Sequence, residues 1–357
     1  MKLYEILSLK INRGRIYALE SEKKQANIEL SCTEIGGLWG VFIQESMSSC
    51  FLIYFLHHLQ DEEIIPLANE ALKISQVRLE KIKNIFLAEN FPIPTAFSEG
   101  ELNLAAPPLF NDVFSLSYIY MMNRLGMINF SYTASNNVRL DVLDFFTECI
   151  HTSTEMFGKA VKMMLSKGIY DRPPKMNYPK EIEFVEKESF LSGIIGNKRP
   201  LNAIELSEIF FNIERNYFSV LIMLAFAQVV KDKELKKHVL KGKTISEKQI
   251  SFFNNLLMKE ELLGTVTVSM EVTDSTLSPF SDKLILSMIN VLNSVDISLI
   301  SHAMSVTMRT DLTVQYSKII AEVMLYAKDT FDIVVQKKWL EQPPLVTNRK
   351  MLIHNKK

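Results

Sequence analysis

The segment LSCTE at residues 30–34 returns as LNAIE at residues 201–205, and the likeness between the two copies continues far along the chain. The offset is 171 residues at first and becomes 170 after one deletion, with acids, amides and aromatic residues kept in the same order. A register held over roughly 145 residues with a single slip indicates a tandem duplication. The clearest matches are Glu34 with Glu205, Asp61 with Asp232, Glu89 with Glu260, Arg139-x-Asp141 with Arg309-x-Asp311, and Pro173-Pro174 with Pro343-Pro344.

The composition of the 357 residues is that of a globular chain with balanced charge. Lys and Arg number 40 and Asp and Glu number 41, so the net charge of −1 gives no reason to expect a nucleic-acid partner. A hydrophobic content of 47% is typical of a packed core, and only 12 Gly and 12 Pro leave little room for a hairpin-rich β fold.

Three features of the sequence predict a cytoplasmic protein without a transmembrane segment. The three cysteines share no metal-binding or redox spacing, which favours a reducing compartment. Charged residues break the apolar run of the N-terminal MKLYEILSLKINRGR, so it does not read as a signal peptide. The uncharged run at 46–56 is too short to cross a bilayer, and we expect it to form a core helix.

Each repeat is predicted to form four helices, because apolar residues recur at spacings of three and four with few interior breakers. A very short turn makes the first two helices antiparallel, and a longer crossing precedes the third, as in ferritin-like proteins. The predicted fold class is therefore all-α, with two tandem ferritin-like antiparallel four-helix bundles related by internal duplication. The predicted helices span 32–60, 62–90, 108–129 and 134–168, then 203–231, 233–260, 278–299 and 304–335.

The domain boundaries follow from the repeat and from the stretch bearing proline and glycine that separates its two copies. The residues before the repeat have no counterpart within it, so nothing in the sequence predicts their role. The predicted units are an N-terminal extension (1–29), a first bundle (30–170), a linker (171–200), a second bundle (201–345) and a C-terminal tail (346–357).

Glu45 and Arg78 interrupt the apolar stripes of the first two helices in the first bundle. At 100° per residue each falls near the middle of its stripe. Glu45 lies about 15 residues before its helix ends, and Arg78 about 15 residues after its helix begins, so antiparallel packing places them at one level. Because a lone interior charge is costly and a paired one is tolerable, we predict a buried Glu45–Arg78 ion pair.

The second bundle has amides at the matching positions, Asn216 and Gln249, which also fall on apolar stripes. Glu322 lies at the edge of the stripe of the last helix, at a similar height. These three residues, with Glu45 and Arg78, form the predicted interior polar sites of the two bundles.

Glu148-x-x-His151 has the spacing of a carboxylate–histidine metal motif in ferritin-like bundles. On the helical wheel both residues lie opposite the apolar stripe, and the second repeat has Lys318 and Ala321 in their places. We therefore interpret the motif as part of a solvated face and expect no metal. If a metal is bound, its candidate ligands are Glu45, Glu148, His151 and Glu322.

The segments KRPLNAIEL (198–206), STLSPFSDKL (275–284) and WLEQPP (339–344) resemble a family of functionally uncharacterised proteins of endospore-forming bacteria. The resemblance extends from about residue 30 to the C-terminus and implies two tandem ferritin-like bundles. It also implies a histidine on the second helix of each bundle, where this chain has Arg78 and Gln249. Arginine cannot ligate a metal and its charge repels one, so the resemblance implies a degenerate metal site here.

Three classes of function remain after these observations. The favoured one is a non-catalytic structural or partner-binding protein, cytoplasmic or associated with the spore, with an unidentified protein partner. It is favoured because the chain has neither a phosphate-binding loop nor a nucleophile motif. The alternative is a ferritin-like oxidoreductase or metal store that binds iron or manganese. The third is a small-molecule or lipid binder with a cavity in one bundle, although ordinary core packing explains the 17 Met and 22 Phe more simply. Nothing in the sequence predicts the oligomeric state.

Overall fold

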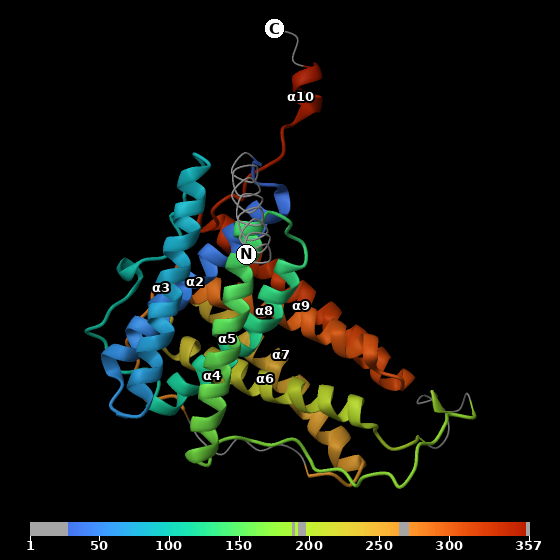
Figure 1. Cartoon of the computed structure of the whole chain (residues 1–357). Coiled ribbons are helices and arrows are strands. Elements are labelled where there is room, and N and C mark those ends of the chain that lie inside the picture. The colour runs from blue at the N-terminus through green and yellow to red at the C-terminus, as the bar shows by residue number, and fades with distance from the viewer. Residues whose placement is uncertain (1–27, 188–189, 192–197, 264–270, 355–357) are drawn as a thin grey trace, which may run out of the picture.

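The computed structural model describes residues 28–187, 190–191, 198–263 and 271–354, and this part of the chain is helical without a β-strand (Figure 1). The all-α prediction and the duplication are confirmed. Two short helices, η1 (Glu99–Glu101) and α10 (Arg349–His354), lie in the first crossing segment and in the C-terminal tail. The long helices are α2 (Cys32–His58), α3 (Ile64–Ala88), α4 (Asp112–Ala134), α5 (Leu140–Ser166), α6 (Ala203–Val229), α7 (Lys233–Lys259), α8 (Asp282–Val306) and α9 (Thr310–Gln336).

The first helix of each repeat begins at a capping box, in which a polar side chain and a glutamate three residues later satisfy each other's backbone amides. In α2 the pair is Ser31 and Glu34, and the Ser31 amide donates to the Glu34 carboxylate at 2.7 Å. In α6 the Glu205 amide donates to the Asn202 side chain at 2.8 Å, and the Asn202 amide donates back to Glu205 at 3.1 Å. The helix starts at 32 and 203 are therefore local properties of the sequence.

An aspartate fixes the short turn that follows the first helix in each repeat. The carboxylate of Asp61 accepts from the amide of Glu63 at 2.9 Å, and Asp232 accepts from Glu234 at the same distance. Capping of this kind starts the next helix at once, so α2 and α3, like α6 and α7, are antiparallel neighbours.

The third helix of each repeat begins and ends later than the sequence predicts. Helix α4 starts after Asn111, whose side chain accepts from the amide of Phe114 at 3.1 Å. Helix α8 starts after Ser281, whose hydroxyl accepts from the amide of Leu284 at 3.0 Å. These caps, rather than the apolar residues that precede them, fix the starts.

The two repeats meet through their crossing segments, which connect the second helix to the third. Two isolated antiparallel bridges join Leu102 to Phe280 and Phe110 to Val272. A shift of 170 residues converts Leu102 into Val272 and Phe280 into Phe110, so each bridge is the repeat equivalent of the other. The two copies are therefore related by an approximate two-fold axis.

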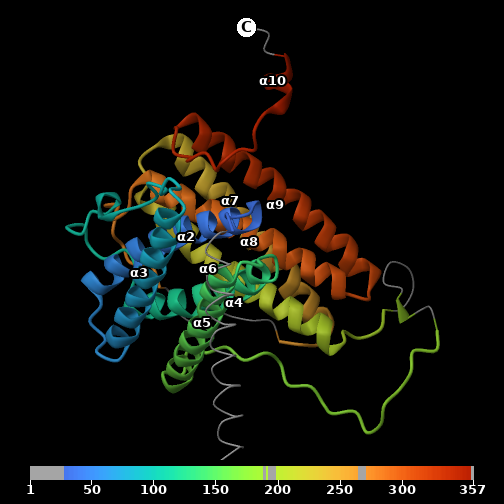
Figure 2. The same ribbon diagram turned by 45° about the horizontal axis from the view of Figure 1, so that its top comes forward.

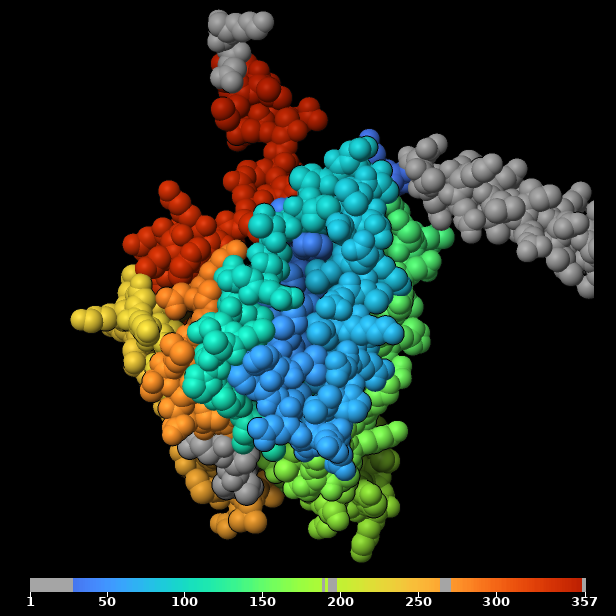
Figure 3. Space-filling model, turned by 90° about the vertical axis from the view of Figure 1, so that its left-hand side faces the viewer, coloured from blue at the N-terminus to red at the C-terminus, as the bar shows by residue number. Residues whose placement is uncertain are grey.

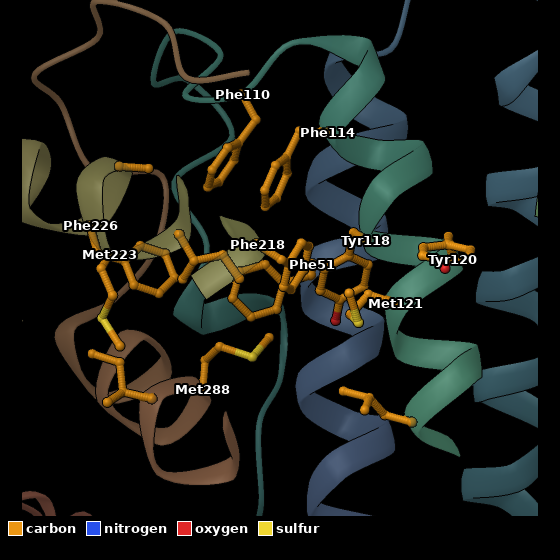
Figure 4. Close-up of a cluster of buried hydrophobic side chains, with 14 of the residues drawn as sticks. Phe51, Phe110, Phe114, Tyr118, Tyr120, Met121, Phe218, Met223, Phe226 and Met288 are labelled. Atoms are coloured by element: carbon orange, nitrogen blue, oxygen red, sulfur yellow. The ribbon is translucent and has the colours of Figure 1, made fainter. Parts of the chain in front are cut away.

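A single hydrophobic cluster runs through this junction (Figure 4). The ring of Phe51 on α2 lies 4.6 Å from that of Phe280, and Phe114 on α4 stacks on Phe218 of α6 at 5.5 Å between ring centroids. Aromatic pairs at these separations add to the energy of burial. The repeats therefore share one core, and a second, smaller cluster fills the far end of the first repeat.

Three of the described helices, α2, α6 and α8, are long and apolar enough to cross a membrane by length and composition. The prediction for α2 considered only the uncharged run, whereas the whole helix has 27 residues. Within their most apolar windows, 67%, 61% and 44% of residues are buried inside the protein, so much of this apolar surface already contacts other helices.

The predicted N-terminal extension lies outside the described residues except for 28 and 29. The described part of the predicted linker runs without regular helix around the lower edge of the molecule, and the C-terminal tail projects from the opposite end (Figures 1 and 2).

Candidate functional site

The interior of the first repeat contains the ion pair that the sequence suggests. Nη1 of Arg78 on α3 lies 2.7 Å from Oε1 of Glu45 on α2, and the two side chains are 11% and 8% exposed. The short turn before α3 brings these distant positions to one level between two antiparallel helices. A charge pair this deeply buried has lost most of its hydration. Its stability therefore depends on hydrogen bonds from other protein groups that replace those to water.

Those hydrogen bonds are nearly complete. Oε2 of Glu45 accepts from the hydroxyl of Ser75 at 2.6 Å. Nη2 of Arg78 donates to Thr152 at 2.7 Å and to Ser153 at 2.9 Å, both on α5. Within this ion pair, Nε of Arg78 is the one side-chain polar atom that has no hydrogen-bond partner among the described residues. The guanidinium therefore ties α2 and α3 to α5 through the centre of the repeat.

Arg78 lines two hollows in the first repeat. A cavity of about 100 Å³ lies on the side of α4 and is also lined by Ser48 and Asn123. A groove of about 270 Å³ between α3 and α5 is also lined by Cys149, whose pKa is raised to about 12 by burial. A thiol with its pKa raised in this way is a poor nucleophile at neutral pH.

The second repeat contains the amide pair at the matching position. Nδ2 of Asn216 on α6 donates to Oε1 of Gln249 on α7 at 3.0 Å, and both residues are buried. Nε2 of Gln249 lies 3.5 Å from the carboxylate of Asp296 on α8. The amide pair is thus part of a larger polar group that includes a charge.

Sequence reasoning missed the ion pair of the second repeat, Arg215 with Asp296. Nη2 of Arg215 lies 3.0 Å from Oδ1 of Asp296. Burial lowers the pKa of Arg215, and burial raises that of Asp296 while Arg215 opposes the rise. At the repeat offsets these residues match Gln44 and Gly126, so comparison of the repeats gives no signal. The signal that the sequence does offer for this ion pair is a charged residue, Arg215, directly before Asn216, which falls on an apolar stripe.

Glu322 does not join the interior group. It lies on the outer side of α9, 41% exposed, and pairs with Lys248 at 2.7 Å. A residue at the edge of an apolar stripe can turn inward or outward, and the neighbouring lysine favours the outward position. The prediction of Glu322 as an interior residue is therefore wrong.

Glu148 and His151 lie on the outer face of α5. Glu148 is half exposed and pairs with Lys81, and His151 is exposed. The candidate metal ligands Glu45, Glu148, His151 and Glu322 consequently do not converge. Among the described residues, no group of three or more His, Cys, Asp or Glu side chains is placed to hold a metal ion.

The residues that define the repeat form a buried polar clasp at one end of each repeat. In the second repeat, Arg309 is fully buried and pairs with Glu260 at 2.5 Å and with Asp311 at 3.0 Å, while its backbone amide donates to Glu205 at 3.0 Å. Arg139 makes the same set of contacts with the equivalent residues of the first repeat. The clasp joins the start of the first helix, the end of the second and the start of the fourth. Its residues therefore hold the helix ends of each repeat together.

The fold and the interior groups define a duplicated all-helical protein whose buried arginines are neutralised by its own acids. The chain belongs to the family described as protein of unknown function (DUF3231), two copies of which match residues 20–182 and 189–352. No curated protein matches the chain.

One solved structure similar to this chain is that of a protein from Bacillus halodurans described as a "putative spore coat protein". The two share 20% identity over 43% of this chain and 99% of the other, with a TM-score of 0.39. At that level the likeness supports no conclusion about function.

Proposed function

We propose that this protein has a non-catalytic structural or partner-binding role, and that each repeat is a ferritin-like bundle with a degenerate metal site. The observation that carries the proposal is the position of the Arg78 guanidinium. It lies in the interior of the first repeat and donates to the buried carboxylate of Glu45.

The donor set around Arg78 is unsuited to a metal ion. A guanidinium has no lone pair to donate and keeps its positive charge at any pH that proteins tolerate. Glu45 already neutralises that charge, and its second oxygen accepts from Ser75. Iron and manganese in helical bundles are held by several carboxylates and imidazoles, whereas Glu45 is the one carboxylate that contacts Arg78 among the described residues.

The second repeat is also poorly suited. Asn216 and Gln249 can offer only neutral amide oxygens, and the oxygen of Gln249 already accepts from Asn216. The nearby carboxylate of Asp296 is paired with Arg215. In both repeats the acid that a metal would require is therefore engaged by an arginine.

The test is metal content by elemental mass spectrometry after expression with added iron and manganese. The parent protein is compared with an Arg78→His, Gln249→His double variant, which introduces an imidazole into each interior. We expect less than about 0.1 metal ion per chain in the parent and a severalfold increase in the double variant, because an imidazole is a better ligand than an amide or a guanidinium.

The matched control is an Arg78→Gln, Gln249→Asn variant, which alters the same positions without adding an imidazole and is expected to stay metal-free. One or two tightly held iron or manganese ions per chain in the parent would contradict the proposal and favour the alternative, a metal-binding oxidoreductase or store. An association with the spore is part of the proposal and rests on the sequence resemblance alone.

A further inference from the structure

The C-terminal segment stands away from the body of the protein with its apolar side chains uncovered (Figure 3). Helix α10 buries no residue, and Val346, Leu352 and Ile353 are 89%, 65% and 74% exposed. Apolar side chains gathered in this way typically mark a surface that binds a partner.

This segment is also basic. Arg349 and Lys350 lie at the start of α10, and neither forms a salt bridge with any part of the chain that the structure describes. A partner for α10 should therefore combine apolar side chains with acidic groups that have no cation of their own.

The linker between the repeats offers such a surface. A hollow of about 950 Å³ is lined by the second half of the predicted linker, from residue 183 to residue 199 where the structure describes it. Its apolar side chains include Phe184 and Val185, which are 88% and 60% exposed. Its charged lining residues are Glu183, Glu186, Lys187, Lys198 and Arg199.

The charges that remain free in this hollow are mainly acidic. Lys198 already pairs with Asp311 at 2.8 Å, and Arg199 pairs with Glu205 at the same distance. Glu183, Glu186 and Lys187 form no salt bridge with the residues that the structure describes, so two carboxylates and one ammonium group remain free in the hollow. The hollow, with its carboxylates beside exposed apolar side chains, is thus complementary to α10 in both charge and apolar character.

Within one molecule the two surfaces lie at opposite ends. In Figures 1 and 2, α10 projects from the top while the linker runs along the lower right, with the helical body between them. The occupant of the hollow that fits this arrangement is therefore the tail of another copy.

We propose that α10 of one molecule docks in the linker hollow of a second copy of this chain. The contact joins two different surfaces, so it leaves an unused tail at one end of the pair and an unused hollow at the other. A contact of this kind propagates into an open chain of molecules unless the geometry closes a ring. The proposal is independent of the interior pairs and of metal content.

The test is sedimentation velocity over a wide range of protein concentration, at low and at moderate ionic strength. We expect the parent protein to associate in a concentration-dependent manner that weakens with salt, as charge-assisted contacts do. Glu183→Lys with Glu186→Lys, or Arg349→Glu with Lys350→Glu, should each weaken association at least tenfold. The variant that combines all four changes should recover most of it, because opposite charges face each other again.

A variant that lacks residues 348–357 provides the second measurement. Its helix content and melting temperature should equal those of the parent, because the described part of the deleted segment buries nothing, while its self-association should be lost. A parent protein that is monomeric at every concentration overturns the proposal. So does unchanged association in either charge-reversed variant or in the truncated one, and so does a fourfold variant that does not recover.

Discussion

Removal of the Arg78 side chain tests the interior of the first repeat most directly. Arg78→Met keeps a long apolar stem but removes the cation and its hydrogen bonds to Glu45, Thr152 and Ser153. The carboxylate of Glu45, only 8% exposed, then remains buried without a counter-charge. The perturbation is therefore the creation of an unpaired buried charge rather than the loss of one contact.

The expected loss in the free energy of unfolding is about 3–5 kcal/mol, the usual cost of breaking a buried pair from one side. Glu45→Gln strands the guanidinium in the same way and should cost a similar amount. The double variant Glu45→Gln, Arg78→Met leaves no charge behind, so its loss should be smaller than that of either single variant, within about 2 kcal/mol of the parent. A double-mutant cycle should thus show strong coupling between the two positions.

The assay is urea denaturation followed by far-UV circular dichroism and tryptophan fluorescence. Trp39 lies on α2 of the first repeat, with its ring 6.5 Å from that of Phe91, and reports on the repeat that carries the change, whereas Trp339 follows α9 and reports on the second repeat. The matched control is Lys248→Met, which breaks the exposed pair with Glu322 and should cost less than about 1 kcal/mol.

Two results would refute this reasoning. One is a loss for Arg78→Met no larger than that for Lys248→Met, which would mean that Glu45 is well solvated once the arginine is gone. The other is a double variant as unstable as the worse single variant, which would mean that side-chain volume rather than charge governs the site.

Two further predictions concern Gly242 and Asp311, both in the second repeat. Gly242→Ala should destabilise the protein by about 1–3 kcal/mol, because an added methyl would lie 2.7 Å from Cζ of Tyr326 and crowd its hydroxyl. Gly158→Ala, where nothing lies within 4 Å, should instead stabilise it by up to about 1 kcal/mol; thermal unfolding of the two variants checks both signs. Burial alone would raise the pKa of Asp311, but Arg309 and a second cation lower it to about 2. Because this folded-state pKa lies below the unfolded value, the carboxylate contributes about 2 kcal/mol near neutral pH, and that stability is lost as the pH falls from about 4 to 2. Urea unfolding across that range should show a steeper decline for the parent than for Asp311→Asn, and equal slopes would contradict the assignment.

Local rules account for the part of the site that the sequence predicts. The level at which Glu45 meets Arg78 depends only on the rise of a helix and on a short turn between antiparallel neighbours, and both can be read from residues close in sequence. The repeat then places Asn216 opposite Gln249 by the same rules. The side of α9 on which Glu322 lies depends instead on how that helix is rotated against its neighbours. The spacing of apolar residues cannot predict whether a residue at the edge of the stripe points inward or outward.

The sequence by itself determined the duplication, the helical character of both repeats and the helix starts set by Ser31 and Asn202, because repeats, periodicity and caps are encoded within a few turns of the chain. Only the tertiary structure decided the pairing of Arg215 with Asp296, the shared core around Phe51 and the separation of the tail from the linker hollow. The first two bring together residues far apart in sequence, and the third places two segments of the chain at opposite ends of the molecule. Such contacts depend on the packing angles of whole helices, which sum many weak interactions and leave no fixed spacing in the chain.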